Sequence, residues 1–251
     1  MAFMPFVTAG DPDLKATQDT IRELAAAGVD LIELGFPYSD PIADGPVIQA
    51  SYTRALNRGI KVSEILNAVA QLHAEGIELP PIVGMVSYAI VFRTGPKQFA
   101  QQVVEAGFSG LIIPDLPGDE AEDMAAVAKE AGLDLIQLVA PTTPADRAER
   151  IVKTCSGFLY CVSVAGTTGV RDGLPDELTD QLKSLREKTD LPFAVGFGIS
   201  QPEHVGVLRG VAQGVIVGSA IVKRMQNEDS AAAVKQIGEF ARSMVEATHS
   251  S

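Results

Sequence analysis

The sequence predicts one α/β domain, a (β/α)8 barrel that spans residues 1–251. Short apolar runs alternate with longer amphipathic segments along the whole chain, and the runs number eight. The runs are continuously apolar, which is typical of parallel strands that are buried on both faces. Division of the 251 residues among eight units gives about 31 residues per unit, the size of one strand with its helix.

The expected strands are short and rich in Val, Ile, Leu and Phe. In chain order they are FMPFVT at 3–8, DLIEL at 30–34, PIVGMV at 81–86, GLII at 110–113, DLIQLV at 134–139, FLYCVS at 158–163, FAVG at 193–196 and GVIV at 214–217.

The segments between the strands are amphipathic and predict helices. Their expected ranges are 14–27, 63–75, 97–106, 120–131, 144–154, 175–189, 201–208 and 230–247. A weak internal repeat, AAGVDLIEL, EAGFSGLII and EAGLDLIQL, joins three of these helices to the strands that follow. Its glycines, Gly28, Gly107 and Gly132, suit the position after a helix end, where a positive φ favours glycine.

A doubly wound open sheet is the alternative fold. It normally has fewer strands and a glycine-rich dinucleotide-binding turn after the first one. Here the first strand ends in TAGDP, which is not such a turn, so the barrel is favoured. We find no linker or low-complexity segment that would divide the chain into domains.

Composition excludes several classes of function. There are 20 Lys and Arg against 32 Asp and Glu, a net charge of −12 without a basic cluster, which argues against nucleic-acid binding. No run of 18 apolar residues predicts a membrane span. The two cysteines, Cys155 and Cys161, form neither a disulfide framework nor a metal-binding pattern, and they favour a reducing, cytoplasmic setting. Three scattered histidines give no reason to expect a metal site.

Glu33 lies inside the second expected strand, in LIELGFP. A carboxylate among apolar neighbours is costly to bury unless it is paired or functional. If the side chain points into the barrel, burial raises its pKa and makes it a proton donor near neutral pH. If it points outward, it is a salt-bridged surface residue, and position alone leaves both interpretations open.

The following loop, PYSDPIADGP, contains Asp40 and Asp44. Barrel active sites form at the carboxyl ends of the strands, so carboxylates here suit acid–base chemistry or a Mg²⁺ site. The alternative is an ordinary turn, in which Asp and Gly are common.

Glycine-bearing loops follow the sixth, seventh and eighth expected strands: SVAGTTGVRDGLP, GFGIS and VGSAIV. Late loops of barrels often bind phosphate through backbone N–H groups, which need glycine for a close approach. Gly169, Gly198 and Gly218 are the candidates, and Ser219 is expected to cap a short helix and add a hydroxyl.

Several motifs in order resemble one family over nearly the whole chain: PFVTAGDP, LIELGFPYSDPIADGP, IIPDLP, GTTG, GFGIS and GSAIVK. Together they resemble the tryptophan synthase alpha subunits. The resemblance implies cleavage of indole-3-glycerol phosphate to indole and glyceraldehyde 3-phosphate, without a metal or organic cofactor on this subunit. It also implies a beta subunit that carries pyridoxal phosphate, in an alpha2beta2 assembly.

The resemblance implies roles for particular residues. Glu33 and Asp44 are the catalytic carboxyls, whereas Asp40 is a loop residue near the partner. The indole pocket is formed by Phe6, Ile48, Tyr160, Thr168 and Phe197, and the phosphate site by Gly169, Gly198, Gly218 and Ser219.

The sequence departs from the family pattern at three places: at Val164, where some relatives carry Arg, at Ile90 and at the start of the chain. Ile90 stands where the family usually has Asn, which weakens a polar contact with the partner and favours a stand-alone lyase as an alternative. A non-catalytic, ligand-binding allosteric subunit is a further alternative. The family usually opens with a helix, whereas here the first strand begins almost at Met1. The barrel is therefore expected to lack that helix and to expose apolar side chains at Phe3 and Met4.

Overall fold

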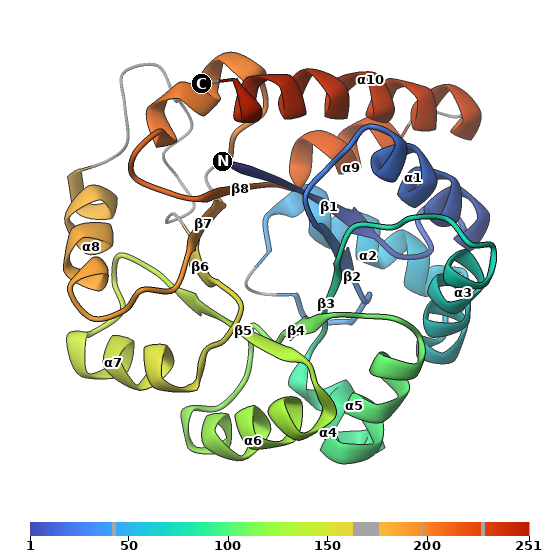
Figure 1. Ribbon diagram of the computed structural model, residues 1–251. Helices are drawn as coiled ribbons and strands as arrows, with labels where there is room; N and C mark the ends of the chain where they lie inside the picture. The colour runs from blue at the N-terminus through green and yellow to red at the C-terminus, as the bar shows by residue number, and fades with distance from the viewer. Residues whose placement is uncertain (42–43, 163–175, 197, 227–228, 251) are drawn as a thin grey trace.

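The computed structural model describes residues 1–41, 44–162, 176–196, 198–226 and 229–250. It confirms the predicted barrel, because eight parallel strands close into a ring in the order β1 to β8 (Figure 1). The fold is therefore a TIM barrel. The strands are β1 Ala2–Thr8, β2 Ile32–Gly35, β3 Ile82–Met85, β4 Gly110–Ile112, β5 Asp134–Val139, β6 Leu159–Val162, β7 Phe193–Gly196 and β8 Gly214–Val217.

Helices surround the strands as an outer layer (Figure 1). Each predicted helix is present, although the segment Pro202–Leu208 (η2) is a 3-10 helix. The α-helices are α1 Leu14–Ala26, α2 Pro46–Asn57, α3 Val62–Ala74, α4 Tyr88–Thr94, α5 Pro96–Glu105, α6 Ala121–Ala131, α7 Ala145–Thr154, α8 Asp176–Arg186, α9 Ser219–Met225 and α10 Ser230–His249, with a short 3-10 turn η1 at Gly118–Glu120.

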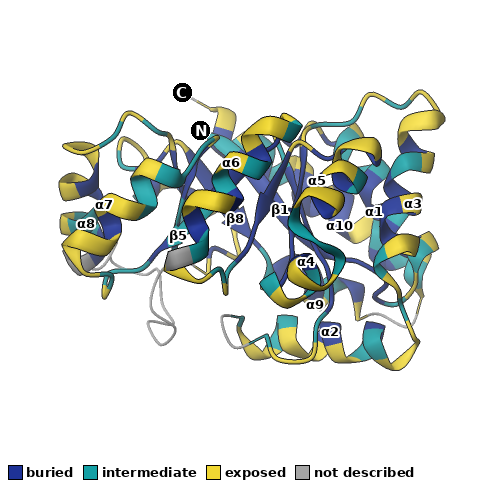
Figure 2. Ribbon diagram, turned by 90° about the horizontal axis from the view of Figure 1, so that it is seen from below, coloured by how far each residue is buried: buried dark blue, intermediate teal, exposed yellow. Residues whose placement is uncertain are grey.

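Two helices were not predicted, α2 and α4. The buried face of α2 consists of Ser51, Tyr52 and Ala55, so it has almost no aliphatic repeat. Only Val91 is buried in α4, which is seven residues long. Both helices follow strand ends, and Figure 2 shows them with α9 at one end of the barrel, opposite the chain termini. The elements that sequence reasoning missed therefore lie at the carboxyl ends of the strands, where barrel active sites form.

Strand residues face two separate apolar regions. One set packs between the strands and the helices, and it includes Phe3, Leu34 and Phe36. The other lies inside the barrel. Its strand residues are Met4, Phe6, Val83, Met85, Ile112, Ile136, Ala194 and Ile216, and they pack with Phe158 just before β6, Tyr52 of α2 and Val222 of α9. Because successive side chains of a strand point to opposite faces, this division fixes which strand positions face the interior.

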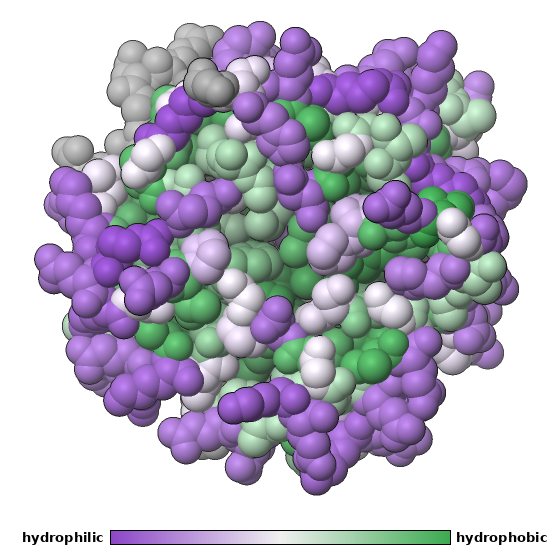
Figure 3. All heavy atoms as spheres, in the orientation of Figure 1, coloured by the Kyte–Doolittle hydropathy of each residue, from purple (hydrophilic) through white to green (hydrophobic). Residues whose placement is uncertain are grey.

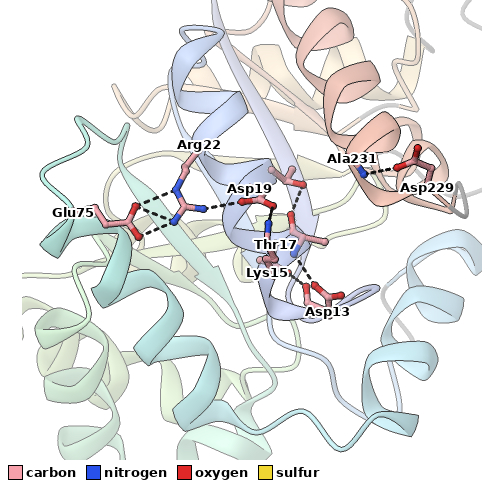
Figure 4. Close-up of polar contacts among 10 residues, drawn as sticks. Asp13, Lys15, Thr17, Asp19, Arg22, Glu75, Asp229 and Ala231 are labelled. Carbon is pink, nitrogen blue, oxygen red and sulfur yellow. Dashed lines mark hydrogen bonds and ion pairs between the residues drawn. The ribbon is translucent and has the colours of Figure 1, made fainter.

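Polar contacts tie the first helix to its neighbours (Figure 4). The Asp13 carboxylate accepts a hydrogen bond from the N–H of Ala16 and so caps α1. Arg22 of α1 donates two hydrogen bonds from Nη2 and one from Nε to Glu75, at the end of α3. Asp229 caps α10 in the same way as Asp13 caps α1. The Arg22–Glu75 contact therefore joins α1 to the end of α3, whereas the Asp13 and Asp229 contacts stabilise the first turns of their own helices.

The expectation that Phe3 and Met4 are exposed is wrong. Phe3 is 0% exposed and Met4 is 8% exposed. Met4 packs inside the barrel against Gly214, where a Cβ would lie 2.8 Å from the Met4 methyl carbon. Figure 3 looks onto this end and shows apolar side chains at its centre within a hydrophilic ring. Side chains from the strands themselves therefore fill this end of the barrel.

No helix in the described ranges combines the length and the apolar character that crossing a bilayer requires.

Candidate active site

A pocket of about 590 Å³ opens at the carboxyl ends of the strands. Residues from β1, β2, β3, β6, β7 and β8 line it, together with residues from the segments that follow β2, β7 and β8. The lining residues are Phe6, Glu33, Asp44, Gly45, Ile48, Met85, Tyr160, Val162, Gly196, Gly198, Ile199, Ser200, Gln201, Ile216, Gly218, Ser219, Ala220, Lys223 and Arg224.

Glu33 points into the barrel and not toward the helices. The register of β2 places it between Phe6 of β1 and Val83 of β3, and the residue is only 1% exposed. Neither carboxyl oxygen has a hydrogen-bond partner among the described residues. Burial raises the pKa of Glu33 to about 8, and the charge of Asp44 adds to this shift. The outward, salt-bridged interpretation of Glu33 is therefore excluded.

Asp44 lies at the rim of the same pocket, just before α2. Its N–H donates to the carbonyl of Pro41, and its carbonyl accepts a hydrogen bond of 2.7 Å from the Gln49 side chain. The Asp44 side chain caps no helix, because α2 begins after Gly45 without a side-chain cap. Burial raises the pKa of Asp44 to about 6, and its buried Oδ2 has no partner in the described structure.

The two carboxyls differ in charge at neutral pH. With pKa values of about 8 and about 6, Glu33 is mostly protonated at pH 7 and Asp44 is mostly ionised. At pH 7 each group is about one pH unit from its pKa, so roughly ten molecules carry protonated Glu33 for each that does not, and roughly ten carry ionised Asp44 for each that does not. One pocket thus holds a proton donor and an anion, the combination that acid–base catalysis requires.

Part of the pocket lining is an apolar wall. It is formed by the predicted residues Phe6, Ile48 and Tyr160 together with Met85 and Ile216, which sequence reasoning did not identify. Gly196 leaves room for Tyr160, because a Cβ there would lie 2.8 Å from the Tyr160 ring. The wall suits a flat aromatic group.

Gly198, Gly218 and Ser219 also line the pocket, and Gly218 lies next to Ile48 and Phe6. Gly198 has a φ of 59°, in the region that favours glycine. The expected cap is wrong in detail: Gly218 is the N-cap of α9, and Ser219 is the first helical residue. Ser219 therefore presents its exposed hydroxyl from the first turn of the helix instead of from a capping position.

Two cations also line the pocket, Lys223 and Arg224 of α9. The sequence motifs did not lead us to expect either cation at this pocket. Their spacing of four and five residues after Ser219 was the signal, because that spacing is about one helical turn. The Arg224 guanidinium lies over the Phe240 ring, 3.9 Å from its centroid, and burial lowers its pKa.

Three predicted site residues, Thr168, Gly169 and Phe197, lie outside the described residues. Asp40 is exposed and lies in a separate groove with Tyr38, Ile90 and Asp115. Within the described ranges, no three His, Cys, Asp or Glu side chains converge as metal ligands.

Comparison with known proteins identifies the family. The model of the tryptophan synthase alpha chain family matches residues 1–249. The tryptophan synthase alpha chain of Rippkaea orientalis is 48% identical over 98% of this chain and 92% of its own length, and that of Rhodopirellula baltica is 47% identical over the same shares.

Solved structures agree with these relatives. A mutant tryptophan synthase alpha-subunit from Pyrococcus furiosus has a TM-score of 0.89 and 36% identity over 97% of both chains. A chain from the tryptophan synthase complex of the same organism has a TM-score of 0.88 and 34% identity over 97% of both chains. The chain described here therefore belongs to the tryptophan synthase alpha chain family.

Proposed function

We propose that Glu33 and Asp44 catalyse the cleavage of indole-3-glycerol phosphate to indole and glyceraldehyde 3-phosphate, the carbon–carbon lyase reaction of the family. The observation that carries the proposal is the pair of carboxyls in one pocket whose pKa values lie on opposite sides of neutrality. The apolar wall of Phe6, Ile48 and Tyr160 fits the indole ring.

The reaction needs protonation of indole C3 before the carbon–carbon bond can break. Glu33 donates this proton, and Asp44 accepts a hydrogen bond from the indole N–H and stabilises the positive charge that develops there. The bond then breaks, its electron pair restores the aromatic indole, and the glycerol hydroxyl loses its proton to Glu33. Glyceraldehyde 3-phosphate forms and Glu33 is again protonated, so the cycle closes without an external base.

The substrate phosphate is assigned to the side of the pocket formed by Gly198, Gly218 and Ser219. The backbone there is accessible because two of these residues have no side chain. Lys223 and Arg224 add positive charge to the same wall, which supports binding of a dianion by a chain whose net charge is −12. Thr168, Gly169 and Phe197 complete the proposed set from the family motifs.

The proposal includes a beta-subunit partner that carries pyridoxal phosphate, in an alpha2beta2 assembly, and a cytoplasmic location. A tryptophan synthase complex among the structural neighbours supports the partner. Phe92 of α4 supports it as well, since this side chain is 67% exposed at the same end of the barrel as the pocket. The two free cysteines fit a reducing compartment.

The test is steady-state release of indole from indole-3-glycerol phosphate, with and without a tryptophan synthase beta subunit. We expect turnover by the wild type that rises when the beta subunit is added. Glu33→Gln should nearly abolish turnover and leave glycerol phosphate binding within a few-fold, because it removes proton transfer and no phosphate contact. High turnover that the beta subunit leaves unchanged would favour the stand-alone lyase, and binding without turnover would favour a non-catalytic subunit.

A further inference from the structure

Tyr52 is a buried polar residue that the mechanism above does not use. It lies on α2, belongs to the apolar cluster inside the barrel and is 0% exposed. Its hydroxyl has no hydrogen-bond partner among the described residues. A phenylalanine would fill the same space without burying an unsatisfied hydroxyl, which costs free energy. The hydroxyl therefore calls for an explanation other than packing.

The position of the hydroxyl is set by Gly35, at the end of β2. A Cβ built on Gly35 would lie 2.5 Å from the Tyr52 oxygen and 2.5 Å from Cζ of Phe6. Any side chain at Gly35 would thus displace one of these rings. Gly35 and Glu33 are two residues apart on one strand, so they face the same side. The Tyr52 hydroxyl accordingly lies inside the barrel, one interior position beyond Glu33 toward the carboxyl end of the strand.

The ring of Tyr52 is held between two other aromatic rings. Its centroid is 5.4 Å from that of Tyr38 and 6.4 Å from that of Phe6. These contacts fix the ring while leaving its oxygen free to donate a hydrogen bond. The ionisable groups around it are Asp44, Tyr38, Glu33 and Tyr160, and the charge of Asp44 acts on it most strongly.

Among these groups Asp44 is the natural acceptor. Glu33 is mostly protonated at neutral pH, whereas Asp44 is mostly ionised and its buried Oδ2 has no partner in the described structure. Burial raises the pKa of Tyr52 well above its usual value, so the phenol keeps its proton and remains a donor. Hydrogen bonds in active sites often tighten only when substrate is bound.

We propose that Tyr52 is a positioning residue, whose hydroxyl donates a hydrogen bond to the Asp44 carboxylate when the pocket is occupied and holds that carboxylate against the indole N–H. The inference rests on the proposed function, because it assigns Tyr52 to the same reaction. It adds a residue from α2 to the catalytic pair.

The test compares Tyr52→Phe with the wild type and with Tyr88→Phe, which removes a hydroxyl on α4 that is bonded to Glu120. We expect Tyr52→Phe to lower kcat about tenfold, the effect of losing one charge-assisted hydrogen bond. The acid limb of its pH–rate profile should move to higher pH, because the Asp44 carboxylate loses a donor. Tyr88→Phe should retain the wild-type kcat and profile.

Two further measurements separate positioning from packing. In urea, the unfolding midpoint of Tyr52→Phe should equal or exceed that of the wild type, because the lost hydroxyl has no partner. Carbon-13 titration of the Asp44 carboxyl, with indole and glycerol phosphate present, should give a higher pKa in the variant. A wild-type kcat, an unchanged Asp44 pKa or a clear loss of stability would each overturn the proposal. Glu33→Gln and Asp44→Asn are assayed beside it, and full activity in both would instead overturn the proposed function.

Discussion

In the proposed mechanism, Glu33 and Asp44 have different roles because they occupy different positions in the barrel. Glu33 lies on β2 between Phe6 and Val83 and is only 1% exposed. Asp44 comes from the rim and remains partly accessible. Burial raises both pKa values, but that of the deeper group rises further and passes neutrality. The neutral form of one residue and the charged form of the other therefore coexist over about two pH units.

The pH dependence of the reaction follows from these values. Turnover needs ionised Asp44 and protonated Glu33, so kcat/KM should rise with pH through about 6 and fall through about 8. The profile of wild-type indole release between pH 5 and 9 measures both limbs. A flat profile across this range would rule out the assigned protonation states.

A substitution at Gly218 tests whether the substrate phosphate binds beside this residue. A Cβ at this position would lie 3.1 Å from Cδ1 of Ile48 and 3.5 Å from Cβ of Phe6, at the pocket wall. Gly218→Val should therefore block the approach of the phosphate and raise KM about tenfold or more, the loss expected for one hydrogen bond to a charged group. Gly118→Val is the matched control, because a Cβ at Gly118 would meet nothing within 4 Å. Equal KM values in the two variants would show that the phosphate binds at another place.

Among the elements, the strands could be predicted because both of their faces are buried. Most are short apolar runs, and Glu33 is conspicuous as the carboxylate inside β2. The two missed helices show the limit of the same reasoning. The core-facing side of α2 is Ser51, Tyr52 and Ala55, so hydrophobic periodicity gives little indication of this helix. The proposed role of Tyr52 depends on its position beside Phe6 and Gly35, which are distant in the sequence. The cations Lys223 and Arg224 could have been predicted from their spacing of about one helical turn after Ser219.

The helix α2 is joined to the loop after β1 by one ion pair. The Arg54 guanidinium donates through Nε and Nη2 to the two carboxyl oxygens of Asp11, at 2.9 and 2.6 Å, and Asp11 is 5% exposed. Arg54→Met would leave this carboxylate buried without its partner. We expect the free energy of unfolding to fall by about 1–3 kcal/mol, since solvent still reaches the arginine side.

Urea unfolding of Arg54→Met measures this loss, with Arg58→Met as the control at an exposed position of the same helix end. Because α2 also positions Ile48 and Tyr52, kcat should fall in Arg54→Met as well. Equal unfolding midpoints in the two variants would show that the Asp11 contact does not stabilise the helix.

For the whole molecule, the active site imposes a cost on stability that depends on pH. The pKa of Glu33 is raised from 4.5 to about 8 on folding, and that of Asp44 from 3.8 to about 6. At a pH between the unfolded and folded pKa of either carboxyl, the folded protein binds more protons than the unfolded chain. The free energy of unfolding must then decrease as pH rises, by at most about 1.4 kcal/mol per pH unit for each carboxyl. Both groups contribute between about pH 4.5 and 6, and Glu33 alone contributes up to about pH 8.

Glu33→Gln isolates this effect, because a glutamine at the same place stays neutral at every pH. Wild type and variant should be similarly stable near pH 4.5, and the variant should become progressively more stable than the wild type up to about pH 8. Urea unfolding at half-unit steps of pH measures the difference, with Glu78→Gln as the control at an exposed carboxylate. Parallel curves for wild type and Glu33→Gln would mean that Glu33 ionises normally in the folded barrel, and it could not then be the proton donor. A widening difference, together with lost turnover, would show that the barrel gives up stability to keep this carboxyl protonated.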